Sequence, residues 1–267
     1  MASSLAEADW SGIAAELLQA LAERRTVSPL TLRYRDITID DAYRIQQLLQ
    51  ARQEDAGARV VGRKIGVTSK AVQDMLGVDQ PDFGFLTEKM RYSNQAVISL
   101  AAANLIQPRA EGEIAFRLKH GIEGPGITRE DVLAATDKVA PCFEIVDSRI
   151  ADWKIRIEDT IADNASCGLF VLGDTWTDPS GVALDEVSMD MFHNGSLACS
   201  GKGSAVQGHP AEAVAWLANR LGALGVGLRP GDIILSGALS RMVDVKAGDR
   251  FDLSMSALGG ASVSFVE

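Results

Sequence analysis

Two carboxylates open an apolar, strand-like stretch of this chain, which reads Ile106-Gln107-Pro108-Arg109-Ala110-Glu111-Gly112-Glu113-Ile114-Ala115-Phe116-Arg117-Leu118. Alternate side chains of a strand share one face, so we expect Glu111 and Glu113 to point the same way. Their Cα atoms would lie about 6.6–7 Å apart, which lets two flexible carboxylates converge on one ion. The stretch therefore predicts a core strand with an acidic end.

A second apolar segment carries one more acid, Glu144, in Pro141-Cys142-Phe143-Glu144-Ile145-Val146-Asp147-Ser148-Arg149. Two like charges about 4 Å apart cost roughly 4 kcal/mol at an effective dielectric of about 20, and a divalent cation removes that cost. Three carboxylates form an oxygen-only site, which favours Mg²⁺, Mn²⁺ or Ca²⁺ over zinc. The alternative is that all three acids face solvent on half-buried strands.

Three further residues are candidates for chemistry. Lys64 lies between Gly62 and Gly66 in a short apolar strand. There it could hold a carboxylate or act as an acid or base. Alternatively, it could extend its amine to solvent from a strand edge. Asp82 follows Pro81, and we expect it on a loop, as a reactive group or as an ordinary turn former. Ser166 ends a run of small polar residues and could orient a substrate oxygen or a water, or simply cap the next strand.

Composition narrows the class of protein. The chain has 267 residues, 46% of them hydrophobic and 23% charged, which is typical of a globular protein. A net charge of −10 without a basic tract argues against nucleic acid and anionic membranes as partners. No apolar run approaches about 18 residues, and the first residues lack the pattern of a signal peptide. Three cysteines without close spacing predict neither disulfides nor a thiolate metal site. We expect a cytoplasmic enzyme that acts on a small molecule.

The periodicity predicts an α+β protein with a helical region over residues 1–60 and a β-rich catalytic domain over 61–267. Helical spacing covers about residues 4–24, and capping boxes at Thr38 and Thr128 begin two further helices. Another helix is expected after His209, and a short one follows Ser69. The predicted strands are short apolar runs separated by turn residues, at 113–118, 140–147, 167–172, 232–236, 250–255 and 261–266.

Several of these stretches together resemble the 2-keto-4-pentenoate hydratase / 4-oxalocrotonate decarboxylase family, within the fumarylacetoacetate hydrolase-like superfamily. The resemblance runs in order from about residue 35 to the C-terminus. The matching segments are Gly62-Arg63-Lys64-Ile65-Gly66-Val67-Thr68-Ser69, Gln80-Pro81-Asp82-Phe83-Gly84, Pro108–Phe116, Glu144–Lys154, Asp159–Ser166 and Ile233–Leu239.

This resemblance implies a mixed β-sheet roll with a smaller helical N-terminal part, assembled into a homo-oligomer that is a pentamer or decamer. It implies a hydro-lyase that adds water to 2-hydroxypenta-2,4-dienoate or an alkyl-substituted relative, in the meta-cleavage catabolism of aromatic compounds. It places Mg²⁺ or Mn²⁺ on Glu111, Glu113 and Glu144, and gives Lys64 and Asp82 as acid/base candidates. Ser166 would orient water or substrate, and the pathway aldolase or decarboxylase is a possible partner.

Two alternatives stay open. A 4-oxalocrotonate decarboxylase would use the same metal site, and Arg149, Lys154 or Arg241 in the distal pocket would favour it by binding a second carboxylate. A hydratase instead needs an apolar wall, for which we expect the segments 83–86 and 238–239. A non-catalytic partner subunit would be expected to lose part of the acidic triad or Lys64, and this sequence retains them all.

Overall fold

The structure is a computed structural model that describes residues 5–267. Its helices are α1 (Glu7–Ala22), α2 (Leu30–Arg33), α3 (Ile39–Asp55), α4 (Lys70–Leu76), α5 (Arg129–Ala135), α6 (Ile157–Ala162) and α7 (Pro210–Gly222). Its strands are β1 (Val60–Gly66), β2 (Asp82–Thr87), β3 (Arg91–Ser93), β4 (Ala96–Ser99), β5 (Arg109–Leu118), β6 (Thr136–Val146), β7 (Cys167–Leu172), β8 (Ser188–His193), β9 (Ser196–Lys202), β10 (Ile233–Ala238), β11 (Val243–Asp244), β12 (Arg250–Met255) and β13 (Gly259–Val266).

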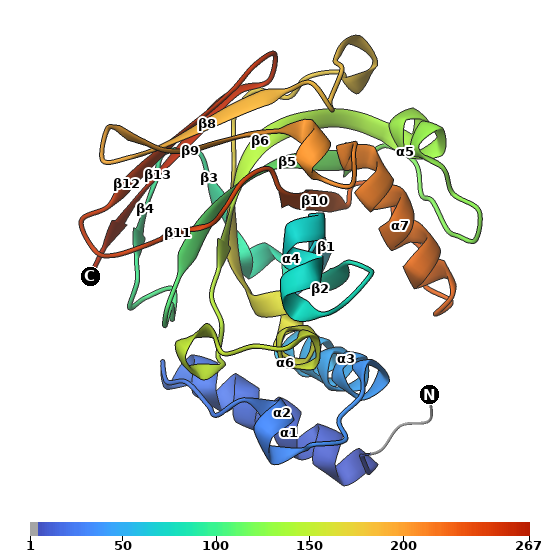
Figure 1. The fold of residues 1–267 in the computed structure, drawn as a ribbon, viewed down its shortest axis with the longest axis vertical. Helices are drawn as coiled ribbons and strands as arrows, with labels where there is room; N and C mark the ends of the chain where they lie inside the picture. Colours follow the sequence, from blue (N-terminus) through green and yellow to red (C-terminus); the bar gives the residue numbers. More distant parts are fainter. Residues whose placement is uncertain (1–4) are drawn as a thin grey trace.

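A mixed, strongly curved sheet is the centre of the fold (Figure 1). Its strands follow the order β2-β1-β10-β5-β6-β7-β3, and β11 pairs with the start of β5. β1 and β10 run parallel, whereas β5 is antiparallel to both β10 and β6. One face of this sheet holds an apolar cluster that includes Ala115, Cys142 and Leu235. The acidic end of β5 lies on that same face because its residues alternate.

A second sheet, in the order β4-β13-β12-β8-β9, packs against the opposite face of β5 and β6. Gly112 separates the two glutamates of β5 and faces this second sheet. A Cβ at that position would lie 2.7 Å from Cδ1 of Leu253, so only glycine allows the two layers to approach this closely.

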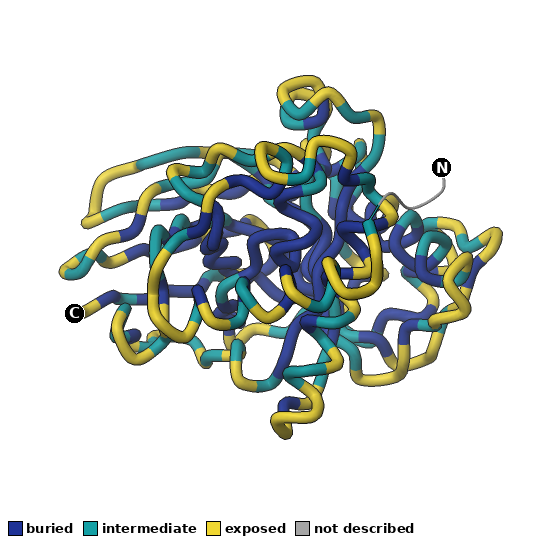
Figure 2. Tube along the Cα trace, turned by 90° about the horizontal axis from the view of Figure 1, so that it is seen from below, coloured by how far each residue is buried: buried dark blue, intermediate teal, exposed yellow. Residues whose placement is uncertain are grey.

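Helices enclose the remaining sides. The sequentially distant helices α1, α3 and α6 pack together below the main sheet, and α7 lies beside β10 and β1 (Figure 1). Ile13 and Leu17 of α1 belong to the same buried cluster as Phe83 and Ile145, so the helical region shares the core of the sheets. Figure 2 shows these buried segments running through the middle of the molecule, with exposed loops around them. Among residues 5–267, no helix has the length and hydropathy needed to cross a membrane.

The elements agree well with the sequence expectations. Both capping boxes form, since Asp41 N donates to Thr38 Oγ1 at 3.1 Å and Asp131 N to Thr128 Oγ1 at 3.3 Å. The helix expected over residues 4–24 is α1, and residue 4 lies outside the described part of the chain. α6 and the β8–β9 hairpin were not expected, because they are short and largely polar or half-exposed. Asp82 begins β2, so its placement on a loop was wrong.

Candidate metal centre and active site

Three carboxylates meet at the acidic end of the central strands. Glu111 and Glu113 extend from the same face of β5, and Glu144 of β6 lies directly opposite Glu111 in the register. One carboxylate oxygen from each residue lies within 4.8 Å of the others. Glu113 and Glu144 are fully buried, while Glu111 is half-buried and reaches the cavity described below. The cluster thus comes from strand alternation in β5 and from one cross-strand pair.

Burial and mutual repulsion disfavour the charged form of this cluster. Burial raises the pKa of Glu113 well above its ordinary value, and the charges of Glu144 and Glu111 raise it further. Burial and the charge of Glu144 raise the pKa of Glu111 to about 7. Glu113 Oε2 accepts the N–H of Gly237 at 2.7 Å, whereas its Oε1 has no hydrogen-bond partner among the described residues. Converging oxygens that repel one another, some of them without a hydrogen-bond donor, fit a hard divalent cation.

Lys64 supplies a positive charge beside the carboxylates. It is 3% exposed, so it does not snorkel to solvent, and its Nζ lies 3.2 Å from Glu144 Oε1. Burial alone would lower the pKa of Lys64, but the charges of Glu144 and Asp82 outweigh that effect and raise the pKa above its ordinary value. The amine is therefore protonated at neutral pH, which favours a role as a cation or proton donor over a role as a free base.

Asp82 shares this corner of the sheet. It is 1% exposed, and burial, opposed by the charge of Lys64, raises its pKa to about 6. Its Oδ1 has no hydrogen-bond partner among residues 5–267. A Cβ at Gly66 would overlap this oxygen and lie 3.2 Å from Lys64 Nζ. The missing side chain at position 66 is what lets the Asp82 carboxylate lie beside the lysine.

Ser166 enters from a loop in a constrained backbone conformation. Asn164, Ala165 and Ser166 all have positive φ values, of 55°, 51° and 52°. Ser166 Oγ lies 3.3 Å from Thr160 Oγ1. Asn164 donates to the carbonyl of Phe85 at 3.0 Å and accepts its N–H at 2.8 Å, which ties this loop to β2, the strand that carries Asp82. Strain of this kind persists only where surrounding contacts hold it.

Lys64, Asp82, Glu111 and Ser166 line one cavity of about 230 Å³. The apolar wall expected from segments 83–86 and 238–239 is only partly right, because Ala238 lines the cavity but Phe83, Phe85, Leu86 and Leu239 are buried in the core instead. The rest of the apolar lining comes from α4, from the segment 153–155, and from Ile65, Val67, Val146, Ala165 and Met242.

The three cations that would favour a decarboxylase are placed differently from one another. Arg149 is buried in an ion pair with Asp163, and Lys154 pairs with Asp152 at 2.9 Å on the surface. Arg241 does line the cavity, but its Nη2 donates to the carbonyl of Ala198 at 2.7 Å. Of these candidates, Arg241 alone could meet a distal carboxylate.

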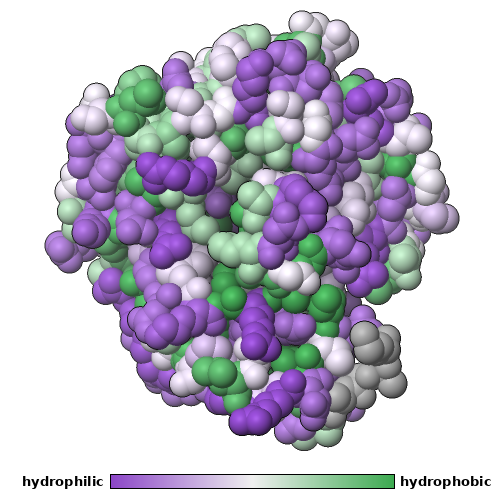
Figure 3. All heavy atoms as spheres, viewed as in Figure 1, coloured by the Kyte–Doolittle hydropathy of each residue, from purple (hydrophilic) through white to green (hydrophobic). Residues whose placement is uncertain are grey.

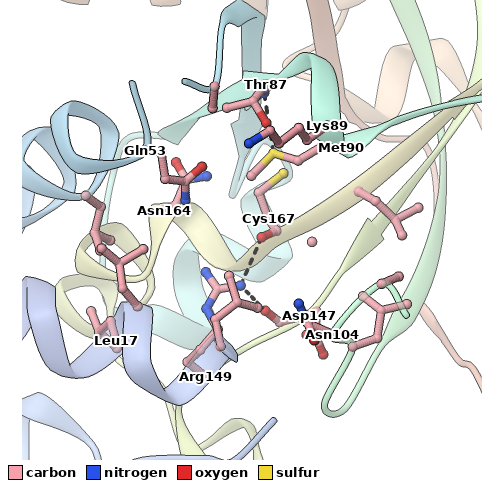
Figure 4. A pocket seen from close by; sticks show the side chains of 18 of the residues that line it. Leu17, Gln53, Thr87, Lys89, Met90, Asn104, Asp147, Arg149, Asn164 and Cys167 are labelled. Atoms are coloured by element: carbon pink, nitrogen blue, oxygen red, sulfur yellow. Dashed lines mark hydrogen bonds between the residues drawn. The ribbon is translucent and has the colours of Figure 1, made fainter. Parts of the chain in front are cut away.

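A second cavity, of about 420 Å³, is lined by residues of α1 and α3 and by Asn164 and Cys167, which flank Ser166 in the sequence (Figure 4). Two of its charged side chains are already committed: Arg149 donates to the carbonyls of Asp147 and Cys167 at 2.6 and 3.0 Å, and Asp147 accepts the N–H of Gln107 at 2.7 Å. The buried side-chain atoms without hydrogen-bond partners in residues 5–267 belong to Asp82, Glu113, Glu144 and Ser236. The unsatisfied polar groups thus gather at the carboxylate cluster and not around this cavity.

The structure is thus a β-sheet roll whose central strands carry three carboxylates that could hold a metal ion. The sequence model of the Fumarylacetoacetate (FAA) hydrolase C-terminal family matches residues 60–266, and this chain belongs to that family. The 2-hydroxyhexa-2,4-dienoate hydratase of Comamonas testosteroni is 60% identical to it, over 94% of this chain and 95% of that protein. A 2-hydroxypent-2,4-dienoate hydratase of Pseudomonas putida is 57% identical to it, over 79% of this chain and 95% of that protein.

A solved structure is similar over almost the whole chain. It is the 4-oxalocrotonate decarboxylase of Pseudomonas putida G7 complexed with magnesium and adipate, with a TM-score of 0.96 and 32% sequence identity. The similarity covers 99% of this chain and 100% of that one. This confirms the expected roll with a helical N-terminal region.

Sequence reasoning missed three supporting residues. Gly66 makes room for Asp82, Gly237 donates its N–H to Glu113, and Asn164 joins the Ser166 loop to β2. All three lie inside segments that the resemblance singled out, but their roles depend on contacts between distant strands. The glycines could be suspected from the sequence only as positions of close approach.

Proposed function

We propose that this protein is a divalent-cation-dependent hydratase of 2-hydroxy-2,4-dienoates, which adds water to give a 4-hydroxy-2-oxo acid. The observation that carries the proposal is the buried cluster of Glu111, Glu113 and Glu144, open to a small cavity and accompanied by a protonated Lys64. The two hydratases similar over most of the chain support the reaction type.

The cluster would hold the cation through its three carboxylates, with Mg²⁺ or Mn²⁺ as the ions that we propose. When bound, such a cation supplies Lewis acidity toward the carboxylate and 2-oxygen of the substrate. The all-oxygen ligand set supports this choice, as does the magnesium with which the similar decarboxylase is complexed. The surplus negative charge of the apo cluster gives the protein a physical reason to bind it.

The side chains around the cavity then divide the remaining work. Overall hydration adds one proton at C5, the hydroxyl group of water at C4 and one proton at C3. The 2-hydroxyl loses its proton as it becomes the 2-oxo group, so the net addition is one water molecule. Asp82, whose pKa of about 6 lies near neutrality, can take up and return a proton at these carbons. Lys64 attracts the substrate carboxylate, and the Ser166 hydroxyl orients the water. Lys64 also lies against Glu144, with Nζ 3.2 Å from Oε1.

The test is turnover of two substrates in one preparation, with and without chelator. Loss of the dienol absorbance of 2-hydroxypenta-2,4-dienoate is followed separately from carbon dioxide released from 4-oxalocrotonate. We expect chelator-sensitive hydration to 4-hydroxy-2-oxopentanoate without carbon dioxide. Faster carbon dioxide release than hydration would reject the hydratase and promote the decarboxylase.

The decarboxylase remains the second candidate because Arg241 lines the cavity and because the similar solved structure has that activity. It is less favoured because the Ala198 carbonyl already accepts from Arg241. A non-catalytic subunit is disfavoured by the assembled acidic cluster. We further propose that the protein acts in meta-cleavage catabolism, in the cytoplasm. We also propose that it forms a homo-oligomer, a pentamer or decamer, and that it associates with the pathway aldolase or decarboxylase. Within the chain, we propose a helical region over residues 1–60 and a catalytic domain over residues 61–267.

A further inference from the structure

The lining of this cavity is chemically mixed. Its polar side chains include Lys64, Asp82, Glu111 and Ser166, described above, and Arg241. Its apolar side chains come mainly from two groups, one on α4 and one from other segments. These are Val72, Met75 and Leu76 of α4, and Trp153, Ile155 and Met242. A ligand whose charged head lies at Lys64 and the carboxylates places its carbon chain against apolar side chains of this lining.

The wall formed by Trp153 is fixed by its neighbours. The indole N–H donates to the carbonyl of Gln107 at 3.0 Å, and the guanidinium of Arg109 lies 4.6 Å from the centre of the ring. Arg109 is held in turn by Asp244 at 3.0 Å. Because these contacts already define the position of the indole, this wall does not need a ligand to order it.

The α4 wall, in contrast, has little to pack against. Gln73 is the buried residue of this seven-residue helix, and it donates to the carbonyl of Val67 at 3.0 Å. Val72 and Leu76 are half-buried and Met75 is 70% exposed, and none of the three packs against either buried hydrophobic cluster of residues 5–267. Figure 3 shows hydrophobic side chains gathered at the centre of the face where Figure 1 draws α4.

We infer that Val72 and Leu76 of α4 form the wall that selects the substituent at the C5 end of the dienoate, so that the enzyme prefers alkyl-substituted 2-hydroxy-2,4-dienoates over the unsubstituted compound. This inference rests on the proposed function. An alkyl group supplies the apolar surface that α4 lacks. Each buried methylene is worth about 0.8 kcal/mol, or roughly a fourfold gain in kcat/KM.

The experiment compares kcat/KM for 2-hydroxypenta-2,4-dienoate with that for the hexa- and hepta-2,4-dienoate homologues, using the Mg²⁺-loaded protein. We expect the hexadienoate to be preferred by about fourfold or more. Val72→Phe narrows the cavity beside α4 and should remove the preference, with the longest homologue losing most. Leu76→Ala widens it and should shift the optimum toward the longest homologue. Leu32→Ala is the matched control, since Leu32 is a 70% exposed leucine on another short helix, away from the cavity.

Ratios between substrates separate selectivity from folding, because a partly unfolded preparation lowers all three kcat/KM values by the same factor. Ratios unchanged in both α4 variants, or a wild-type preference for the unsubstituted dienoate, overturn this inference while leaving the hydratase proposal intact. A wild-type protein that hydrates none of the three substrates rejects the proposed function and this inference with it.

Discussion

Glu113→Gln tests the carboxylate cluster most directly, because it removes one charge while keeping the shape of the side chain. The amide oxygen can still accept the Gly237 N–H, which Glu113 Oε2 accepts at 2.7 Å. Two unit charges 4.8 Å apart, the outer limit of the separations in the cluster, repel by about 3.5 kcal/mol at an effective dielectric of about 20, and fully charged pairs that lie closer repel more. Protonation reduces that repulsion, since the pKa of Glu113 itself is raised well above its ordinary value and that of Glu111 is raised to about 7.

We therefore expect the variant to be more stable than wild type without cation, by about 1–3 kcal/mol at pH 7–8, or several degrees in Tm. The Mg²⁺-induced rise in Tm expected for wild type should be lost, and activity should fall by about 10²-fold or more. Calorimetry of both proteins with EDTA and with Mg²⁺, alongside dienol turnover, measures all three effects. A variant that keeps full activity and the full Mg²⁺-induced shift would refute the idea that Glu113 is a ligand.

The other predictions concern the corner formed by Lys64, Asp82 and Gly66. Asp82→Asn should lower kcat by about 10²-fold or more. If Asp82 is the base, it must be ionised, so wild-type kcat/KM should fall as the pH drops through about 6. This acidic fall should be absent in the variant. An unchanged fall would show that another group titrates there. Lys64→Met, which leaves Glu144 buried without its cation, should reduce kcat similarly, whereas a change confined to KM would assign Lys64 to substrate binding. Gly66→Ala should displace the Asp82 carboxylate and lower kcat, while the circular dichroism spectrum stays native. Gly12→Ala in α1 is the control, because no atom lies within 4 Å of its added methyl group. It should leave activity unchanged and raise the free energy of unfolding by up to about 1 kcal/mol. Equal activity of the two glycine variants would show that the space at Gly66 does not matter.

The sequence alone determined the features that depend on local geometry. Glu111 and Glu113 share a face because strand side chains alternate, and the capping boxes at Thr38 and Thr128 start helices through contacts three residues apart. The six apolar runs expected as strands all form strands, because short apolar runs bounded by turn residues are a local signal. The apolar surroundings of Glu144 already suggested that it would join the two glutamates, and the resemblance to a known family added the expectation that Lys64 and Asp82 would lie with them.

Only the tertiary structure decided how these residues meet. Lys64 on β1 and Glu144 on β6 are three strands apart in the sheet order, which would be about 14 Å in a flat sheet, yet their side chains lie 3.2 Å apart. The reach of the two long side chains and the curvature of the sheet together close that distance, and Gly66 leaves space for the Asp82 carboxylate beside Lys64. The apolar wall was expected in the wrong segments because it depends on where α4 lies across the cavity. Strand pairing, curvature and helix placement are set by contacts between residues far apart in the chain, and no local pattern records them.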